Sequence, residues 1–155
     1  MYSTAVNENC TFISDGSASF LSALLRAASY AEGRVEGALG EAGLSLAKLG
    51  VLNQLVQSGE ALPLGRIAGR ISCVKSNVTQ LVDRLEAEGL VARVSDQSDR
   101  RCIRAAITEQ GRERYLTGAT ILRRQEELLI QEIDAARIEE LISCLSLLGG
   151  VSQMH

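Results

Sequence analysis

The side chains best suited to binding chemistry in this sequence are short polar groups and cations between residues 75 and 101. Hydroxyl and amide groups pair with the edges of DNA bases, and guanidinium groups bind phosphate. The polar groups accompany an apolar pattern of helical spacing, and a turn-rich segment, DQSDRR, follows them. The candidates for contacts with DNA are Lys75, Ser76, Asn77, Thr79, Gln80, Arg84, Arg100 and Arg101.

No enzyme motif accompanies this set. The sequence lacks the zinc-protease, phosphate-loop, dinucleotide-binding and nucleophile-elbow motifs, and its single histidine is the last residue. The four cysteines include no C-x-x-C pair, so neither a metal site nor a cofactor is expected. Cys73 and Cys102 lie in apolar patterns and are expected to be buried, which leaves Cys10 and Cys144 as the redox candidates.

The composition is that of a globular protein, with 46% hydrophobic and 23% charged residues. No apolar run approaches the ~20 residues of a membrane span, and no secretory signal opens the sequence, so a cytoplasmic protein is expected. The net charge is −3, yet residues 66–104 hold eight basic and five acidic residues. A basic centre in an acidic frame favours a protein that touches phosphates with one surface.

The elements around the polar set form a predicted helix-turn-helix. Val78, Leu81, Val82 and Leu85 recur at the spacing of one helical face and predict a helix over 75–88 that ends at Gly89. A short helix over 64–71 precedes it, and the second helix of such a pair enters the major groove of DNA. Strand-like runs at 91–94 and 102–107 flank DQSDRR and predict a β-hairpin.

Helices are expected on both sides of this region. A helix over about 17–44 contains glycines 33, 37 and 40, which predict either a bend or close packing against another helix. Ser45, Thr108 and Asp134 are suited to cap three further helices, the first of which ends near Gly59. The last helix has apolar residues at relative positions 0, 3, 4, 7 and 10 from Ile138.

The ordered segments NVTQLVDRLEAEGLV, DQSDRR and ITEQG resemble the MarR family of winged helix-turn-helix regulators, and the resemblance extends from about residue 21 to 148. It implies a mainly α fold with a small β-hairpin wing, in which a winged helix-turn-helix lobe joins a helical dimerisation lobe. The implied organisation is an irregular arm at 1–16, a dimerisation helix at 17–44, a DNA-binding lobe at 45–108 with its wing at 91–107, and C-terminal dimerisation helices at 109–150. A homodimer that binds a roughly palindromic site follows from the family's interleaved terminal helices.

The resemblance also implies individual roles. Arg100 and Arg101 match the wing arginines, one of which enters the minor groove, and Asp99 matches the acidic residue that orients the wing arginine. Members respond to small aromatic anions or to oxidants, which makes Tyr30 and Arg34 candidate ligand contacts; the alternative is a core tyrosine and a surface arginine.

The implied function is a DNA-binding transcriptional regulator, a repressor released by a small ligand or an oxidant. The peroxide-sensing branch has a reactive cysteine early in the first helix, where this sequence has Phe20. The alternative function is a protein-interaction dimer or antirepressor of the same fold without DNA binding.

Overall fold

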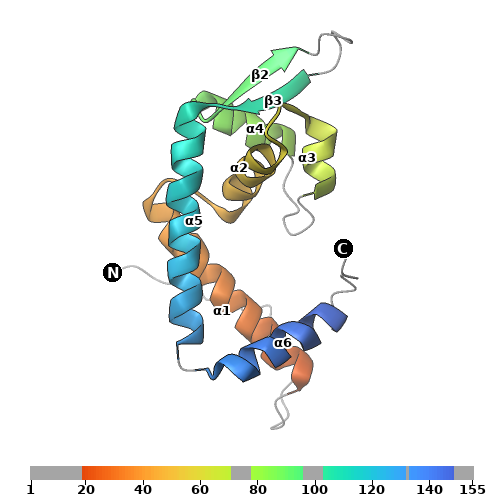
Figure 1. The fold of residues 1–155 in the computed structure, drawn as a ribbon, viewed down its shortest axis with the longest axis vertical. Coiled ribbons are helices and arrows are strands. Elements are labelled where there is room, and N and C mark those ends of the chain that lie inside the picture. The colour runs from red at the N-terminus through yellow and green to blue at the C-terminus, as the bar shows by residue number, and fades with distance from the viewer. Residues whose placement is uncertain (1–18, 71–77, 96–102, 132, 149–155) are drawn as a thin grey trace, which may run out of the picture. The chain divides into compact units, whose positions relative to one another are not determined.

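The computed structural model describes residues 19–70, 78–95, 103–131 and 133–148, in two compact units, 1–33 and 34–155 (Figure 1). Helix α1 (Phe20–Glu41) begins in the first unit and ends in the second. It is one continuous helix, so its three glycines do not interrupt it. No helix in the described ranges is long and apolar enough to cross a membrane.

The second unit contains the elements expected from the sequence, together with one additional strand. The elements after α1 are α2 (Leu46–Ser58), β1 (Leu62–Pro63), α3 (Leu64–Arg70), α4 (Val78–Ala87), β2 (Val91–Ser95), β3 (Ile103–Ile107), α5 (Glu109–Ile130) and α6 (Ala135–Leu148). The mainly helical fold class is therefore confirmed. The expected hairpin is the larger part of a three-stranded antiparallel sheet of order β1-β3-β2, because Leu62 pairs with Ala105 on the free edge of β3.

The helix ends follow the predicted capping chemistry. Ser45 Oγ accepts a hydrogen bond of 3.2 Å from the backbone N–H three residues ahead, and Thr108 Oγ accepts one of 3.0 Å in the same way. Asp134 Oδ1 accepts from the N–H two residues ahead at 3.1 Å. Gly59 ends α2 in the left-handed conformation, with φ of 68°. These four residues set the boundaries of α2, α5 and α6.

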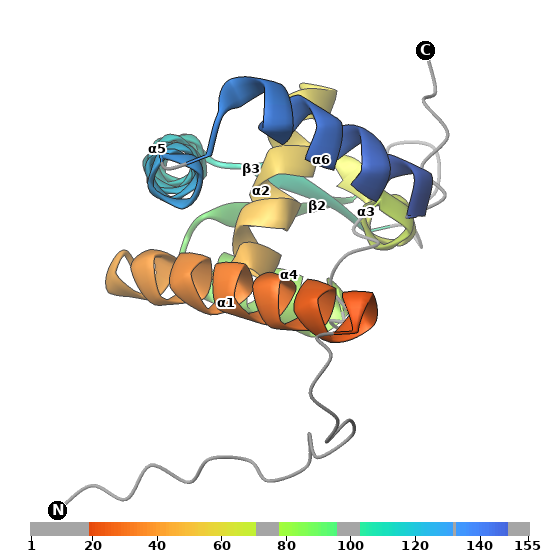
Figure 2. The same ribbon diagram turned by 90° about the horizontal axis from the view of Figure 1, so that it is seen from below.

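Helix α2 is the central element of the core. It lies between α5 and α3 in both views (Figure 1, Figure 2), and it also packs against β3 and α4. Its buried residues, Leu49, Val51, Leu52 and Leu55, therefore occupy more than one side of the helix. The buried core consists of Leu39, Leu44, Leu49, Val51, Leu52, Leu55, Leu62, Ile67, Leu81, Val82, Leu85, Leu90, Val91 and Ala105.

Within the described part of the chain, close backbone packing occurs at glycines of α5 and not at those of α1. A Cβ atom on Gly37 or Gly40 of α1 would meet no atom of the chain within 4 Å. A Cβ on Gly118 would lie 2.6 Å from Leu49 Cδ1, and one on Gly111 would lie 2.0 Å from the carbonyl oxygen of Leu90. The two glycines of α5 thus allow this helix to approach α2 and the turn before β2.

Candidate DNA-binding surface

Helix α4 is fixed by its apolar face and leaves the remainder exposed. Leu81, Val82 and Leu85 are buried, and α4 packs against α2, α3 and β2. The helix ends at Ala87, and the predicted left-handed residue after it is Gly89, whose φ is 72° and whose N–H donates to Glu86 O at 2.9 Å. This arrangement holds the outer side of α4 away from the core, where it is available to a partner.

The outer side of α4 has two flanks of different character. At 100° per residue, Thr79 shares one flank with Asp83 and Glu86, and Gln80 shares the other with Arg84. The side chains of all five are exposed. Hydrogen-bonding and cationic groups thus occupy the second flank, and carboxylates dominate the first.

Several of the residues singled out in the sequence lie outside the described residues. The predicted DNA contacts among them are Lys75, Ser76, Asn77, Arg100 and Arg101. The others are Asp99, the redox candidate Cys10, and Cys73 and Cys102, which were expected to be buried. The structure describes the recognition helix from Val78 onward, so of the predicted contacts it brings Thr79, Gln80 and Arg84 together on one exposed surface.

Strands β2 and β3 form the base of the wing, which we define as residues 91–107. They pair over five residues, from Val91 opposite Ile107 to Ser95 opposite Ile103. Arg104 on β3 donates from Nη1 to Ala61 O at 3.4 Å, which ties the wing to the segment before β1.

Arg93 on β2 forms ion pairs with two carboxylates of α4. Its Nη2 donates to Asp83 Oδ1, and its Nε lies 3.6 Å from Glu86 Oε2. The backbone N–H of Arg93 also donates to Glu86 Oε1 at 3.3 Å. This cation, one of the eight that make residues 66–104 basic, is thus engaged within the chain.

A second ion pair lies where α4 ends. Lys48 of α2 donates from Nζ to Glu88 Oε1 at 2.6 Å and to Gly43 O at 3.2 Å. The pair joins the turn after α4 to the loop between α1 and α2. Sequence patterns did not indicate either of these pairs, because each joins residues in different elements.

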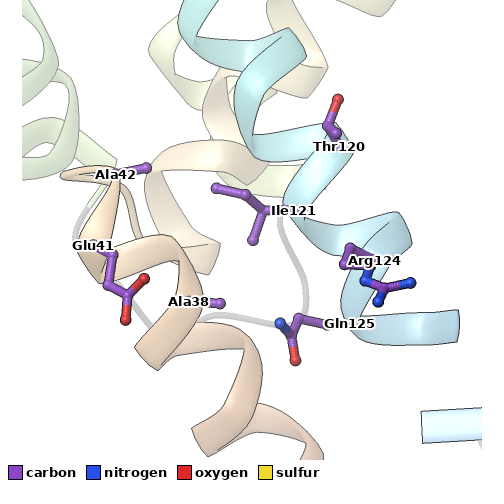
Figure 3. Close-up of a pocket in the computed structure, with 7 residues that line it drawn as sticks. All are labelled: Ala38, Glu41, Ala42, Thr120, Ile121, Arg124 and Gln125. Atoms are coloured by element: carbon purple, nitrogen blue, oxygen red, sulfur yellow. The ribbon is translucent and has the colours of Figure 1, made fainter. Parts of the chain in front are cut away.

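A cavity of about 470 Å³ lies between α1 and α5 (Figure 3). In Figure 3, Ala38, Ile121 and Gln125 point into the space between these helices, and the Arg124 guanidinium points away from α1. Arg34 Nη2 donates to Gln125 Oε1 at 3.2 Å, so Arg34 holds one wall of the cavity. The lining residues are Ala38, Glu41, Ala42, Thr120, Ile121, Arg124 and Gln125.

A smaller cavity of about 270 Å³ lies between α2 and α5. Tyr115 lines it, and its hydroxyl donates to Asn53 Oδ1 at 3.0 Å. The aromatic residue expected from the sequence to contact a ligand is Tyr30. Tyr30 is 61% exposed and is therefore not a core residue, and it does not line either cavity.

The terminal helices expose apolar surface. Leu141, Ile142 and Leu145 of α6 are 50%, 58% and 46% exposed, although they follow the predicted helical stripe. Cys144 of the same helix is an exposed free thiol. A surface of this kind is typical of a protein interface.

The central segment of the chain matches a known protein family. Residues 44–103 match the model of the MarR family. The HTH-type transcriptional repressor MdtR of Bacillus subtilis (strain 168) is 39% identical over 69 residues, which are 44% of this chain and 44% of MdtR. The aligned segments span 44% to 51% of the length of the curated relatives that the chain matches.

Solved structures agree over a longer stretch. CouR from Rhodococcus jostii RHA1, bound to p-coumaroyl-CoA, is 26% identical with a TM-score of 0.69, and the match covers 86% of this chain and 93% of CouR. CouR bound to a 23-mer DNA duplex gives a TM-score of 0.75 at 23% identity, over 84% of this chain and 92% of CouR. The likeness thus includes both the winged helix-turn-helix and the helices around it.

Proposed function

Because this chain belongs to the MarR family of winged helix-turn-helix transcriptional regulators, we propose that it binds double-stranded DNA and regulates transcription. The observation that carries the proposal is α4, whose apolar face is buried in the lobe while Gln80 and Arg84 are exposed on its outer side. A helix fixed in this way beside a twisted hairpin suits the major groove, with the hairpin over the adjacent backbone. The family's regulators are not enzymes, which agrees with the absence of catalytic motifs in the sequence.

The proposed contacts divide by chemistry. Amide and hydroxyl groups of α4 and the residues before it read base edges, and Lys75 and Arg84 bind phosphates. Arg100 and Arg101 belong to the wing, where one guanidinium enters the minor groove and Asp99 orients it. The base-reading set is Ser76, Asn77, Thr79 and Gln80.

The acting form is proposed to be a homodimer. The apolar side chains of α6 are exposed in the single chain, and Gly37 and Gly40 of α1 leave room for close approach by another helix. A two-fold dimer presents two recognition helices ~34–36 Å apart, so its operator is a rough palindrome with half-sites one helical turn apart.

Repression with release by a small ligand is the proposed mode of regulation. CouR from Rhodococcus jostii RHA1 is bound to p-coumaroyl-CoA in one solved structure, and a transcriptional repressor named CouR is bound to DNA in another. The cavity between α1 and α5, at about 470 Å³, is in the size range of ligand pockets. We place an aromatic anion there, with Arg34 and the Gln125 amide at one wall. Tyr30, the other ligand candidate from the sequence, does not line this cavity, and its role stays a prediction. Release by oxidation of Cys10 or Cys144 is the competing trigger.

Selection of duplexes from a random DNA library, followed by fluorescence anisotropy on the selected sequence, tests this function. We expect a palindromic consensus and an affinity that falls steeply with salt, because phosphate contacts release counterions. Arg101→Ala should weaken binding by about 1–3 kcal/mol if its guanidinium reads the groove. Arg123→Ala, an exposed arginine of α5 with the same change of charge, is the control and should bind as wild type does.

The alternative function gives a different result. A protein-interaction dimer or antirepressor would select no consensus sequence, and Arg101→Ala would bind non-specific duplex as weakly as the control does. A cysteine-free variant that an aromatic anion still releases from DNA would show that oxidation of a cysteine is not required for release.

A further inference from the structure

We infer that Arg93 and Lys48 are positioning residues of the recognition helix. They neutralise three carboxylates that lie in the C-terminal half of this helix or directly after it, they hold the helix to β2 and α2, and they do not bind phosphate. The inference rests on the proposed DNA-binding function, and it assigns roles to two residues outside the proposed contact set.

The carboxylates of α4 present an electrostatic problem. Asp83, Glu86 and Glu88 lie in the last turns of α4 or directly after it. The C-terminal end of a helix carries a partial negative charge, so acidic residues there are unfavourable. A recognition helix in a groove also brings them near phosphates, and like charges in that position oppose binding.

Arg93 offsets two of the three charges. Its guanidinium pairs with Asp83 and Glu86, and its backbone N–H donates to the Glu86 carboxylate. Only 29% of the Arg93 side chain is accessible, and its Nε is buried without a hydrogen-bond partner among the described residues. A guanidinium held in this way cannot extend to a phosphate without abandoning both carboxylates.

Lys48 offsets the third charge from the opposite side of the helix end. Its ammonium contacts Glu88 at 2.6 Å, and only 18% of its side chain is accessible. The same ammonium donates to Gly43 O, so Glu88 is connected to the loop before α2. Together the two cations fix the end of α4 to the wing on one side and to α2 on the other.

This arrangement leaves one flank of α4 for DNA. The flank of Asp83 and Glu86 faces Arg93, and Thr79 shares it by helical spacing. The flank of Gln80 and Arg84 has no carboxylate on α4. After Thr79, DNA contacts along α4 are therefore assigned to the Gln80 side, with Asp83 and Glu86 turned toward Arg93.

The test is a cycle of three variants: Arg93→Gln, Asp83→Asn/Glu86→Gln, and all three substitutions combined. Arg93→Gln frees two carboxylates beside the duplex, and we expect it to weaken binding to the selected duplex about tenfold. The combined variant should bind within about threefold of Asp83→Asn/Glu86→Gln, because the guanidinium has nothing left to neutralise. The combined variant and Asp83→Asn/Glu86→Gln should show the same slope of log affinity against log salt concentration.

A phosphate contact by Arg93 would give a different result. If Arg93 binds phosphate, Arg93→Gln weakens binding by the same factor in both backgrounds and lowers the salt slope by ~1, which overturns the inference. Lys48→Gln and Lys48→Gln/Glu88→Gln give the same comparison for the second pair.

Urea unfolding of the same variants without DNA separates this inference from the proposed function. The pairing predicts a coupling of about fivefold in the unfolding equilibrium constant between Arg93 and its carboxylates. Additive unfolding effects would overturn the pairing even if wild type binds DNA. If wild type selects no duplex while the coupling is present, both the proposed DNA-binding function and the proposed role of the ion pairs in it are wrong. The ion pairs would then only stabilise the fold.

Discussion

Gly111→Ala is expected to destabilise the DNA-binding lobe even though it improves helix propensity. Gly111 lies in the first turn of α5, and a Cβ there would be 2.0 Å from Leu90 O and 2.9 Å from Ile107 Cγ1. Ordinary contacts between carbon and a carbonyl oxygen are ~3.3 Å or longer. The start of α5 and the turn before β2 must therefore separate by roughly 1 Å, which breaks packing between two backbone segments.

The magnitude follows from two opposing terms. Replacing glycine by alanine inside a helix gains about 1 kcal/mol. Overpacking a tight site costs about 1–3 kcal/mol, and a clash with backbone belongs at the upper end because no side-chain rotation relieves it. We expect a net loss of about 2 kcal/mol in the free energy of unfolding.

Urea denaturation followed by circular dichroism measures this loss, at one protein concentration for all variants, since a dimer's midpoint depends on concentration. Gly65→Ala in α3 is the matched control, because its Cβ meets no atom within 4 Å and its φ is not in the left-handed region. The control should be unchanged or slightly stabilised. A Gly111→Ala variant as stable as wild type would refute the packing argument.

Three further predictions concern the Ser45 cap, the partly buried Tyr115 and the proposed dimer. Ser45→Ala should cost about 1 kcal/mol in unfolding free energy through loss of the hydrogen bond to the start of α2, and Ser45→Asp should restore it. Tyr115→Phe leaves Asn53 Oδ1 without its donor and should cost about 1–2 kcal/mol, whereas Tyr115→Phe/Asn53→Leu should recover part of the loss. Leu145→Asp places a charge in the exposed apolar stripe of α6 and should convert a dimer into monomer or aggregate in sedimentation velocity; an unchanged dimer would contradict the assignment of α6 to the interface.

The sequence predicted those parts of the fold that depend on neighbours along the chain. Ser45, Thr108 and Gly89 specify helix ends through local hydrogen bonds and backbone angles, so their types and positions were sufficient. The amphipathic pattern of α4 was equally clear because a single face of that helix is buried.

Features that depend on distant segments were not predictable. Leu62 and Pro63 form a strand only because β3 offers a free edge, and Val51 is buried only because α2 is covered on several sides. A bend or close packing was expected at the three glycines of α1, whereas within the described part of the chain close contacts occur at Gly111 and Gly118 of α5. The pairing of Arg93 with α4 joins residues seven and ten positions apart across a turn, where no helical or strand periodicity applies.

The turn after α4 has a mechanical consequence. Leu90 O accepts a hydrogen bond of 3.2 Å from Thr108 N, and Thr108 Oγ donates to Gly89 O at 2.7 Å. The end of the recognition helix, the beginning of the wing and the beginning of α5 are therefore fastened at one point. Helix α5 has 22 residues and extends ~33 Å at 1.5 Å per residue. A displacement of about 3 Å at its far end therefore corresponds to a tilt of roughly 5°. We therefore expect a shift of the distal end of α5 to turn the end of α4 and the start of β2 together, because both are bonded to Thr108 at the start of α5.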